Sequence, residues 1–297
     1  MILIAGGTGF IGQVLAKHLI DMEIPVRLLV RPSKKTPRLM TGKKLDIAVA
    51  SLQDERSLRA AFTDVDVLIH LVSDERRGAR ADFAGVDIQG THALIRAAQQ
   101  SRIKQLIYLS HLGADRGSAF AMLKTKSICE NSIMHSQVPY TILRSGVVYG
   151  PNDQFTLPIA QLIKRSAGMV FVPGDGNTLI QPVWVEDLAA CIHWTLDNPN
   201  AINQILSVGG GEYLTIRQVV IDILQAIRRK RLVVPLGPVY LRNLALIIEQ
   251  FIGQLPVSIN WLDYLASDRT CSVDTLPRIF GIIPSRFSSQ LGYLKGK

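Results

Sequence analysis

An α/β protein built on a doubly wound parallel sheet is the fold class that the sequence predicts, and two observations predict it. Short apolar runs recur through the first half of the chain, namely MILIA, PVRLLV, LDIAVA, DVLIH, QLIYLS and YTILR. Helical periodicity separates several of them, at Phe10–Leu19, Glu55–Phe62 and Ala84–Gln100. Strands that alternate with helices form parallel sheets with helices on both faces. A chain of 297 residues is long enough for one large domain of this type with a smaller part appended.

The regular alternation loosens after GVVYGP, which spans Gly146–Pro151. Beyond it we expect a helix near Thr156–Arg165, a strand at MVFVPG, a helix within PVWVEDLAACIHWTL, and one more strand and helix. No linker divides the chain cleanly. We therefore assign residues 1–150 to the main sheet domain. Residues 151–297 are expected to complete the sheet and to form a smaller C-terminal lobe for a substrate or partner.

The motif GGTGFIG lies between the first predicted strand and the first predicted helix, and places Gly6, Gly9 and Gly12 three residues apart. Such a turn lets the backbone approach a pyrophosphate closely, and the helix N-terminus then offers free N–H groups. The strand–turn–helix context is the one that this motif requires. We therefore predict a Rossmann domain that binds NAD(P), with pyrophosphate contacts from the backbone of Thr8, Phe10 and Ile11.

The residue after the second predicted strand indicates which nucleotide is bound. A free ribose 2′-hydroxyl calls for Asp or Glu there, whereas this chain has Arg31, followed by Lys34 and Lys35. A guanidinium group can bind a 2′-phosphate through two hydrogen bonds. The sequence thus favours NADP(H), with NAD(H) as the second candidate and a solvated basic loop as the structural alternative.

Further nucleotide contacts are expected at the ends of later strands. Asp54 follows the third strand, and Leu71 and Val72 end the fourth, where the adenosine half of the cofactor should lie. Gly146 and Val147 follow the sixth strand and should lie near the nicotinamide ring.

With these motifs, and with YLS, KTKSICE, ILRSGVVYGP and VWVEDLA, residues 1 to about 196 resemble the extended or atypical branch of the short-chain dehydrogenase/reductase superfamily. The resemblance implies a catalytic Ser, Tyr and Lys. Ser110 and Lys126 stand at the serine and lysine positions, but Met122 stands where tyrosine belongs. A thioether cannot donate a proton, and losing a general acid typically costs a factor of about 10²–10⁴ in rate. His111 is the candidate replacement donor, weighed against a loop histidine with no role.

Three functional hypotheses follow from the resemblance. The first is a structural or regulatory NADP(H) binder, similar to the branch that contains the nucleotide-binding accessory subunit of respiratory complex I and assembly factors of photosynthetic membranes. The second is an NADPH-dependent reductase or isomerase without the tyrosine, similar to NmrA-like proteins, with Lys126 binding ribose or acting as the acid/base group. The third is a nucleotide-sugar epimerase or dehydratase, which the missing tyrosine argues against.

The composition of the chain limits the kinds of binding partner that we expect. The net charge of +9 is compatible with anionic ligands or an anionic membrane surface, but no zinc-finger spacing or RNA-binding signature accompanies it, so nucleic acid is not expected. Three separated cysteines predict neither disulfides nor a metal site. The first strand begins at Met1 and no run reaches the roughly 18 apolar residues that span a bilayer. We expect a cytoplasmic protein, peripheral at a membrane surface in one interpretation.

That interpretation rests on the C-terminal part. Four consecutive cations, Arg228 to Arg231, precede the apolar stretch Tyr240–Ile252, whose spacing is helical. Cations that meet anionic head groups beside Leu, Ile and Phe are typical of an interfacial helix. A lobe helix buried on the Rossmann domain is the structural alternative.

Overall fold

A seven-stranded, wholly parallel sheet forms the centre of the computed structural model, which describes residues 1–33, 44–237, 240 and 264–295. Its strand order is β11-β6-β5-β4-β1-β2-β3. The strands are β1 (Ile2–Ala5), β2 (Val26–Val30), β3 (Leu45–Val49), β4 (Val67–His70), β5 (Gln105–His111), β6 (Tyr140–Ser145) and β11 (Gln204–Val208). The order reverses between β1 and β4, where ligands bind in open sheets of this type.

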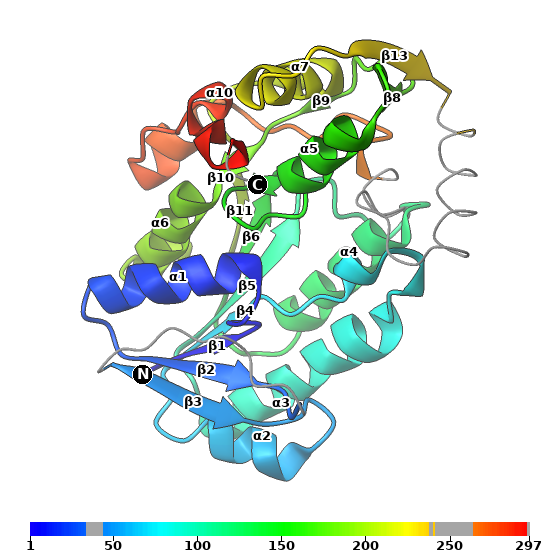
Figure 1. The fold of residues 1–297 in the computed structure, drawn as a ribbon. Helices are drawn as coiled ribbons and strands as arrows, with labels where there is room; N and C mark the ends of the chain where they lie inside the picture. The colour runs from blue at the N-terminus through cyan, green and yellow to red at the C-terminus, as the bar shows by residue number, and fades with distance from the viewer. Residues whose placement is uncertain (34–43, 238–239, 241–263, 296–297) are drawn as a thin grey trace.

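Helices cover both faces of the sheet (Figure 1). On one face α1 (Phe10–Asp21) packs on α6 (Val185–Leu196), and their apolar side chains share a buried cluster with β1 and β2. On the other face lie α2 (Glu55–Ala61), α3 (Gly90–Ser101) and α4 (Ala121–Met134), over a second buried cluster. Because both faces are covered, the central strand β1 is apolar and buried along its whole length, as its sequence predicts, whereas the edge strand β3 is largely exposed.

A smaller lobe packs at the carboxyl edge of the sheet. It contains α5 (Thr156–Arg165), α7 (Ile216–Ala226) and the parallel pair β8 (Met169–Pro173) and β13 (Leu232–Leu236). Two-residue strands join it to the sheet, and these are β7 (Val148–Tyr149), β9 (Leu179–Ile180), β10 (Val183–Trp184) and β12 (Leu214–Thr215). Short helical segments follow at Leu276–Phe280, Phe287–Gln290 (α10) and Leu291–Leu294. A third buried cluster joins these elements to the first turns of α4.

The predicted fold class is confirmed, with two differences in detail. The stretch predicted as one helix over Ala84–Gln100 is a π-helical segment, Phe83–Gln89, followed by α3. The segment begins where the Asp82 carboxylate accepts a hydrogen bond from Gly85 N (2.8 Å). In addition, β5 extends one residue further than predicted and includes His111.

Two sequence-based predictions fall outside the described residues. Lys34 and Lys35 lie there, as does Tyr240–Ile252 apart from Tyr240 itself. Among the helices that the structure does describe, none combines the length and the apolar character needed to cross a bilayer.

Candidate functional site

The glycine motif forms a tight turn between β1 and α1. Gly6 has a φ of +91°, which favours glycine, and Gly9 N donates to Gly6 O at 3.0 Å. A Cβ atom at Gly12 would lie 2.4 Å from Gly6 O, so the helix can approach the turn this closely only with glycine there. The first turn of α1 has no acidic residue and no side-chain cap. The N–H groups of Phe10 and Ile11 are therefore available to an anion, which fits a dinucleotide pyrophosphate.

The end of β4 lies directly beside this turn. Leu71 N donates to Ala5 O at 2.8 Å, and a Cβ at Gly6 would lie 2.9 Å from the Leu71 carbonyl carbon. Leu71 and Val72 are thus next to the glycine motif, although β4 ends at His70 and they follow the strand rather than end it as predicted. Their contact with the adenosine half of a nucleotide stays a prediction. The side chain of Thr8 is exposed at the same place.

Arg31 and Asp54 lie at the edge of this region. Arg31 is exposed and directly follows β2, and its contact with a ribose 2′-phosphate stays a prediction. Asp54 caps α2, because its Oδ1 accepts a hydrogen bond from Arg56 N at 3.1 Å. The sequence interpretation missed this capping role, and the adenine contact of Asp54 stays a prediction.

Ser110 and Lys126 are both buried at the carboxyl end of β5. Ser110 is fully inaccessible, and its Oγ has no hydrogen-bond partner among the described residues. Lys126 reaches across from α4, with its Nζ 5.4 Å from the centre of the Tyr108 ring. A buried hydroxyl without a partner is costly, and this one lies beside the lysine that the resemblance pairs with it. Met122, one turn earlier on α4, is 5% exposed and packs in the core of the lobe.

Two carboxylates face this cluster. Glu75 Oε2 accepts a hydrogen bond from His111 Nε2 at 2.9 Å. Burial opposes ionisation of Glu75, but the adjacent His111 and Lys126 outweigh it and lower the pKa of the carboxyl group to about 2. Asp87 is 1% exposed, and burial raises its pKa although Lys126 acts in the opposite direction. Lys126 thus lies within electrostatic reach of a carboxylate that is ionised and of one whose proton is held more tightly.

His111 contacts both the Glu75 carboxylate and an aromatic ring. Its ring contacts the Tyr264 ring at a centroid distance of 5.6 Å, and its Nδ1 is buried with no hydrogen bond to any described residue. The hydrogen bond to the Glu75 carboxylate holds the imidazole ring in one orientation. The structure therefore brings together Ser110, His111 and Lys126, which the sequence predicts, with Glu75, which it does not.

His70 is a second residue that the sequence analysis did not assign. It is fully buried, accepts a hydrogen bond from Val72 N through Nδ1 (3.2 Å) and lies 2.8 Å from Thr91 Oγ1 through Nε2. Burial and the nearby Lys126 lower its pKa to about 3, so the ring is neutral. The only sequence signal for His70, Glu75 and Asp87 is that polar residues interrupt or follow apolar segments near strand ends.

Gly146 and Val147 link the sheet to the lobe. Gly146 N donates to Val208 O at 2.8 Å, and a Cβ there would lie 2.2 Å from Gln181 O. The side chain of Val147 is 1% exposed and packs in the core of the lobe. A contact from Val147 to a nicotinamide ring would therefore come from its backbone. Among the described residues, no group of three or more His, Cys, Asp or Glu side chains could hold a metal ion.

Two family profiles match the chain. Residues 6–160 match the family described as NAD(P)H-binding, and residues 118–209 match the NAD dependent epimerase/dehydratase family.

Three relatives illustrate the range of proteins that the chain resembles in sequence. The chain is 29% identical over 217 residues to NADH dehydrogenase [ubiquinone] 1 alpha subcomplex subunit 9, mitochondrial, of Arabidopsis thaliana, an alignment that covers 71% of this chain and 54% of the relative. It is 32% identical over 160 residues to the photosystem II assembly factor Ycf39 of Cyanophora paradoxa, covering 53% and 49%. The chain thus spans about half the length of these two relatives. An NAD(P)H azoreductase of Xenophilus azovorans is 28% identical, covering 72% of this chain and 70% of the relative.

Solved structures share the fold along nearly the whole chain. A UDP-glucose 4-epimerase of Thermus thermophilus, in complex with NAD, superposes with a TM-score of 0.72 at 20% identity and covers 99% of both chains. A nucleoside-diphosphate-sugar epimerase of Staphylococcus aureus gives a TM-score of 0.77 at 16% identity, covering 98% of this chain and 99% of the other. At these identities the likeness shows the fold and nothing finer.

Proposed function

Because the chain belongs to the NAD(P)H-binding family, within the atypical short-chain dehydrogenase/reductase superfamily, we propose that it holds NADP(H) as a structural or regulatory cofactor. One contrast carries this proposal. The glycine turn and the open N-terminus of α1 are intact, whereas buried Met122 stands where the resemblance places the proton-donating tyrosine. Binding is supported by the first feature, and a low capacity for turnover by the second.

The nucleotide carried by the purified protein tests this proposal. We expect about one NADP(H) per chain, identified by mass spectrometry after release, whose oxidation state does not change when carbonyl or quinone compounds are added. An empty protein that also fails to bind added NADPH would contradict the proposal. So would rapid oxidation of the bound nucleotide.

The preference for NADP(H) rests on Arg31. Replacing it by Asp puts a carboxylate where the 2′-phosphate is expected, so Arg31→Asp should weaken NADPH binding at least tenfold and leave NADH binding unchanged or improved. Fluorescence titration with both nucleotides checks this. Arg56→Asp, on α2, is a control with the same charge change. Equal losses for both nucleotides in Arg31→Asp would contradict the assignment.

We further propose that the protein acts with a membrane-associated or hydrophobic partner. Two relatives named above are a subunit of NADH dehydrogenase and an assembly factor of photosystem II. The basic charge of +9 and the apolar C-terminal part of the sequence support the same proposal.

A second candidate function is an NADPH-dependent reductase, and the Glu75–His111 pair favours it. The pair could hold a proton near Ser110 in place of a tyrosine, and one relative is named an NAD(P)H azoreductase. NADPH consumption with an azo dye as acceptor tests this candidate. If it holds, His111→Asn should slow turnover by roughly 10²-fold while NADPH affinity is unchanged. A wild-type protein that consumes no NADPH with azo, quinone or carbonyl acceptors would contradict it.

A further inference from the structure

The outer face of the β8–β13 pair is apolar although it is exposed to solvent. Side chains alternate along β8, so Val170 and Val172 are buried while Met169 and Phe171 are 48% and 43% exposed. In the parallel register Leu232 lies opposite Met169, and Leu232 is 66% exposed. A two-stranded sheet with one buried face normally presents polar residues on the other. An exposed apolar face of this kind is typical of a surface that binds a partner.

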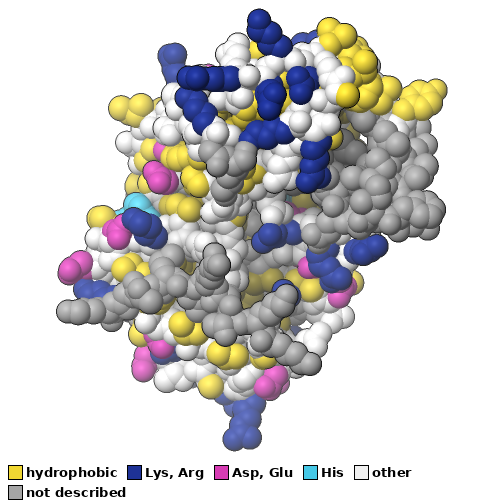
Figure 2. Space-filling view, viewed as in Figure 1, with side chains coloured by type: hydrophobic (Ala, Val, Ile, Leu, Met, Phe, Trp, Pro, Cys, Tyr) yellow, Lys and Arg dark blue, Asp and Glu magenta, His cyan; other side chains and the backbone are white. Residues whose placement is uncertain are grey.

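Cations outnumber carboxylates around this face, where Asp175 and Asp222 lie just beyond the segments that follow. The segments 156–173 and 223–237, which contain α5, β8, the end of α7 and β13, contain six Lys and Arg residues and no Asp or Glu. Arg165, Arg228, Arg229 and Lys230 are exposed and make no ion pair with a described residue. Figure 2 shows dark blue and yellow side chains gathered at this upper end of the molecule.

The cationic segment is held against the lobe. Arg231 donates from Nε to Ser166 O at 3.1 Å, which fastens the start of β13 to the end of α5. The neighbouring N–H group of Arg229 bonds back to Leu224 O at 3.0 Å and closes α7. These bonds fix Arg228, Arg229 and Lys230 beside the exposed edge of the small sheet.

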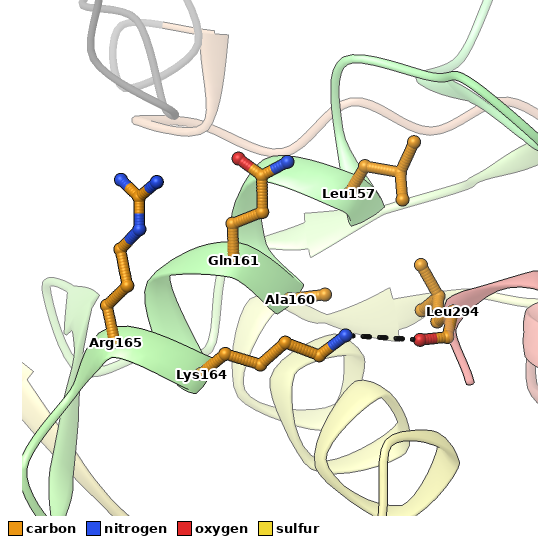
Figure 3. Close-up of a pocket in the computed structure, with 6 residues that line it drawn as sticks. All are labelled: Leu157, Ala160, Gln161, Lys164, Arg165 and Leu294. Carbon is orange, nitrogen blue, oxygen red and sulfur yellow. Dashed lines mark hydrogen bonds between the residues drawn. The ribbon is translucent and has the colours of Figure 1, made fainter. Parts of the chain in front are cut away.

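A shallow apolar groove of about 150 Å³ lies on α5, on the same lobe (Figure 3). It is lined by Leu157, Ala160, Gln161, Lys164, Arg165 and Leu294. Lys164 Nζ donates to Leu294 O at 3.4 Å across it. A hollow of this size, apolar inside and cationic at its rim, can take part of an acyl chain while its head group meets the cations.

We propose that this surface, formed by Met169, Phe171 and Leu232 with Arg165, Arg228, Arg229 and Lys230, binds an anionic lipid bilayer. Apolar side chains enter the boundary between head groups and acyl chains, and the four cations pair with anionic head groups. A second copy of the chain fits less well, since a symmetric contact would bring two clusters of unpaired cations together. The inference rests on the proposed association with a membrane or hydrophobic partner, and it assigns that association to described residues outside the nucleotide site.

Flotation of the full chain with vesicles tests the proposal. We expect the protein to float with vesicles that contain phosphatidylserine and to remain at the bottom with pure phosphatidylcholine. The triple variant Arg228→Glu/Arg229→Glu/Lys230→Glu should lose at least tenfold in vesicle affinity. Phe171→Ser/Leu232→Ser, which leaves the charge unchanged, should also lose several-fold.

A matched control separates this surface from overall charge. Arg56→Glu/Arg96→Glu/Lys124→Glu makes the same charge change at exposed positions on α2, α3 and α4, and should keep at least half of the vesicle affinity. Equal losses in the two triple variants would overturn the proposal, as would a wild-type protein that does not float. Vesicle binding that Phe171→Ser/Leu232→Ser leaves intact would mean that charge alone attracts the protein to the vesicles without apolar insertion, and would also overturn the proposal.

NADPH titration of every variant keeps this test separate from the cofactor proposal. We expect the surface variants to bind NADPH as the wild type does. A protein that floats but binds no nucleotide would refute the cofactor proposal alone. If the surface variants bind NADPH and still float, the surface assignment alone is wrong.

Discussion

His70 shows how a single buried side chain makes the stability of this fold depend on pH. Its ring is fully buried, and its two nitrogens are both engaged, with Val72 N and Thr91 Oγ1. Thr91 Oγ1 in turn donates to Asp87 O at 2.6 Å. The neutral ring therefore connects the end of β4 to the first turn of α3, and a proton added to it would bring a second buried charge close to Lys126.

The sign of the pH effect follows from the lowered pKa. The folded state holds His70 with a pKa of about 3, whereas an unfolded histidine has a pKa of roughly 6.5, so the unfolded state binds more protons between these values. The contribution of His70 to stability is complete above pH 6.5 and decreases as the pH falls toward 3. Between pH 7 and pH 5 this amounts to about 2 kcal/mol, at 1.36 kcal/mol per unit.

Urea unfolding at pH 7 and pH 5 measures this loss. The variant His70→Gln keeps polar groups at the site but cannot titrate, so its free energy of unfolding should fall by about 2 kcal/mol less over the same interval. His135→Gln serves as the control, because the His135 side chain is exposed. If the wild type and His70→Gln lost the same free energy between the two pH values, the assignment to His70 would be wrong.

At the scale of elements, the turn between β1 and α1 is the most constrained feature of the site. A Cβ at Gly12 would lie 2.4 Å from Gly6 O and 2.6 Å from the Gly7 Cα, and both are backbone atoms that no rotamer change can move. We expect Gly12→Ala to displace α1, weaken NADPH binding at least tenfold and lower the unfolding temperature. Gly292→Ala is the matched control, because a Cβ there meets nothing within 4 Å. Unchanged NADPH affinity in Gly12→Ala would show that the turn does not carry the nucleotide.

The elements that sequence could predict are those whose pattern is local. The glycine motif, the strands and α5 each have their signal within a few neighbouring residues. The partnership of β8 with β13 could not be predicted in this way, because about 60 residues separate the two strands. The Glu75–His111 pair could not be predicted for the same reason, because it joins the segment after β4 to the end of β5.

At the scale of the whole molecule, the two halves of the chain are interleaved. The strand β11 and the helix α6 both come from beyond residue 150, yet β11 pairs with β6 and α6 packs on α1. The helix α4 carries Lys126 toward the Tyr108 ring of β5 and Met122 into the core of the lobe. A substitution at position 122 would therefore alter the packing of the lobe as well as the surroundings of Lys126.

This arrangement leads to a prediction for Met122→Tyr, the substitution that would introduce the tyrosine that the sequence resemblance implies at this position. Met122 is 5% exposed and packs among the apolar side chains of the lobe, so a phenol there would be overpacked and its hydroxyl poorly hydrated. We expect NADPH oxidation with carbonyl compounds to rise less than tenfold, whereas a working general acid supplies about 10²–10⁴. Absorbance of NADPH measures the rate, and circular dichroism checks folding. The double variant Met122→Tyr/Lys126→Met is the control, because a genuine relay needs both side chains. A gain of 100-fold or more that this control abolishes would mean that only the proton donor had been lost and that the lobe still shapes a working pocket.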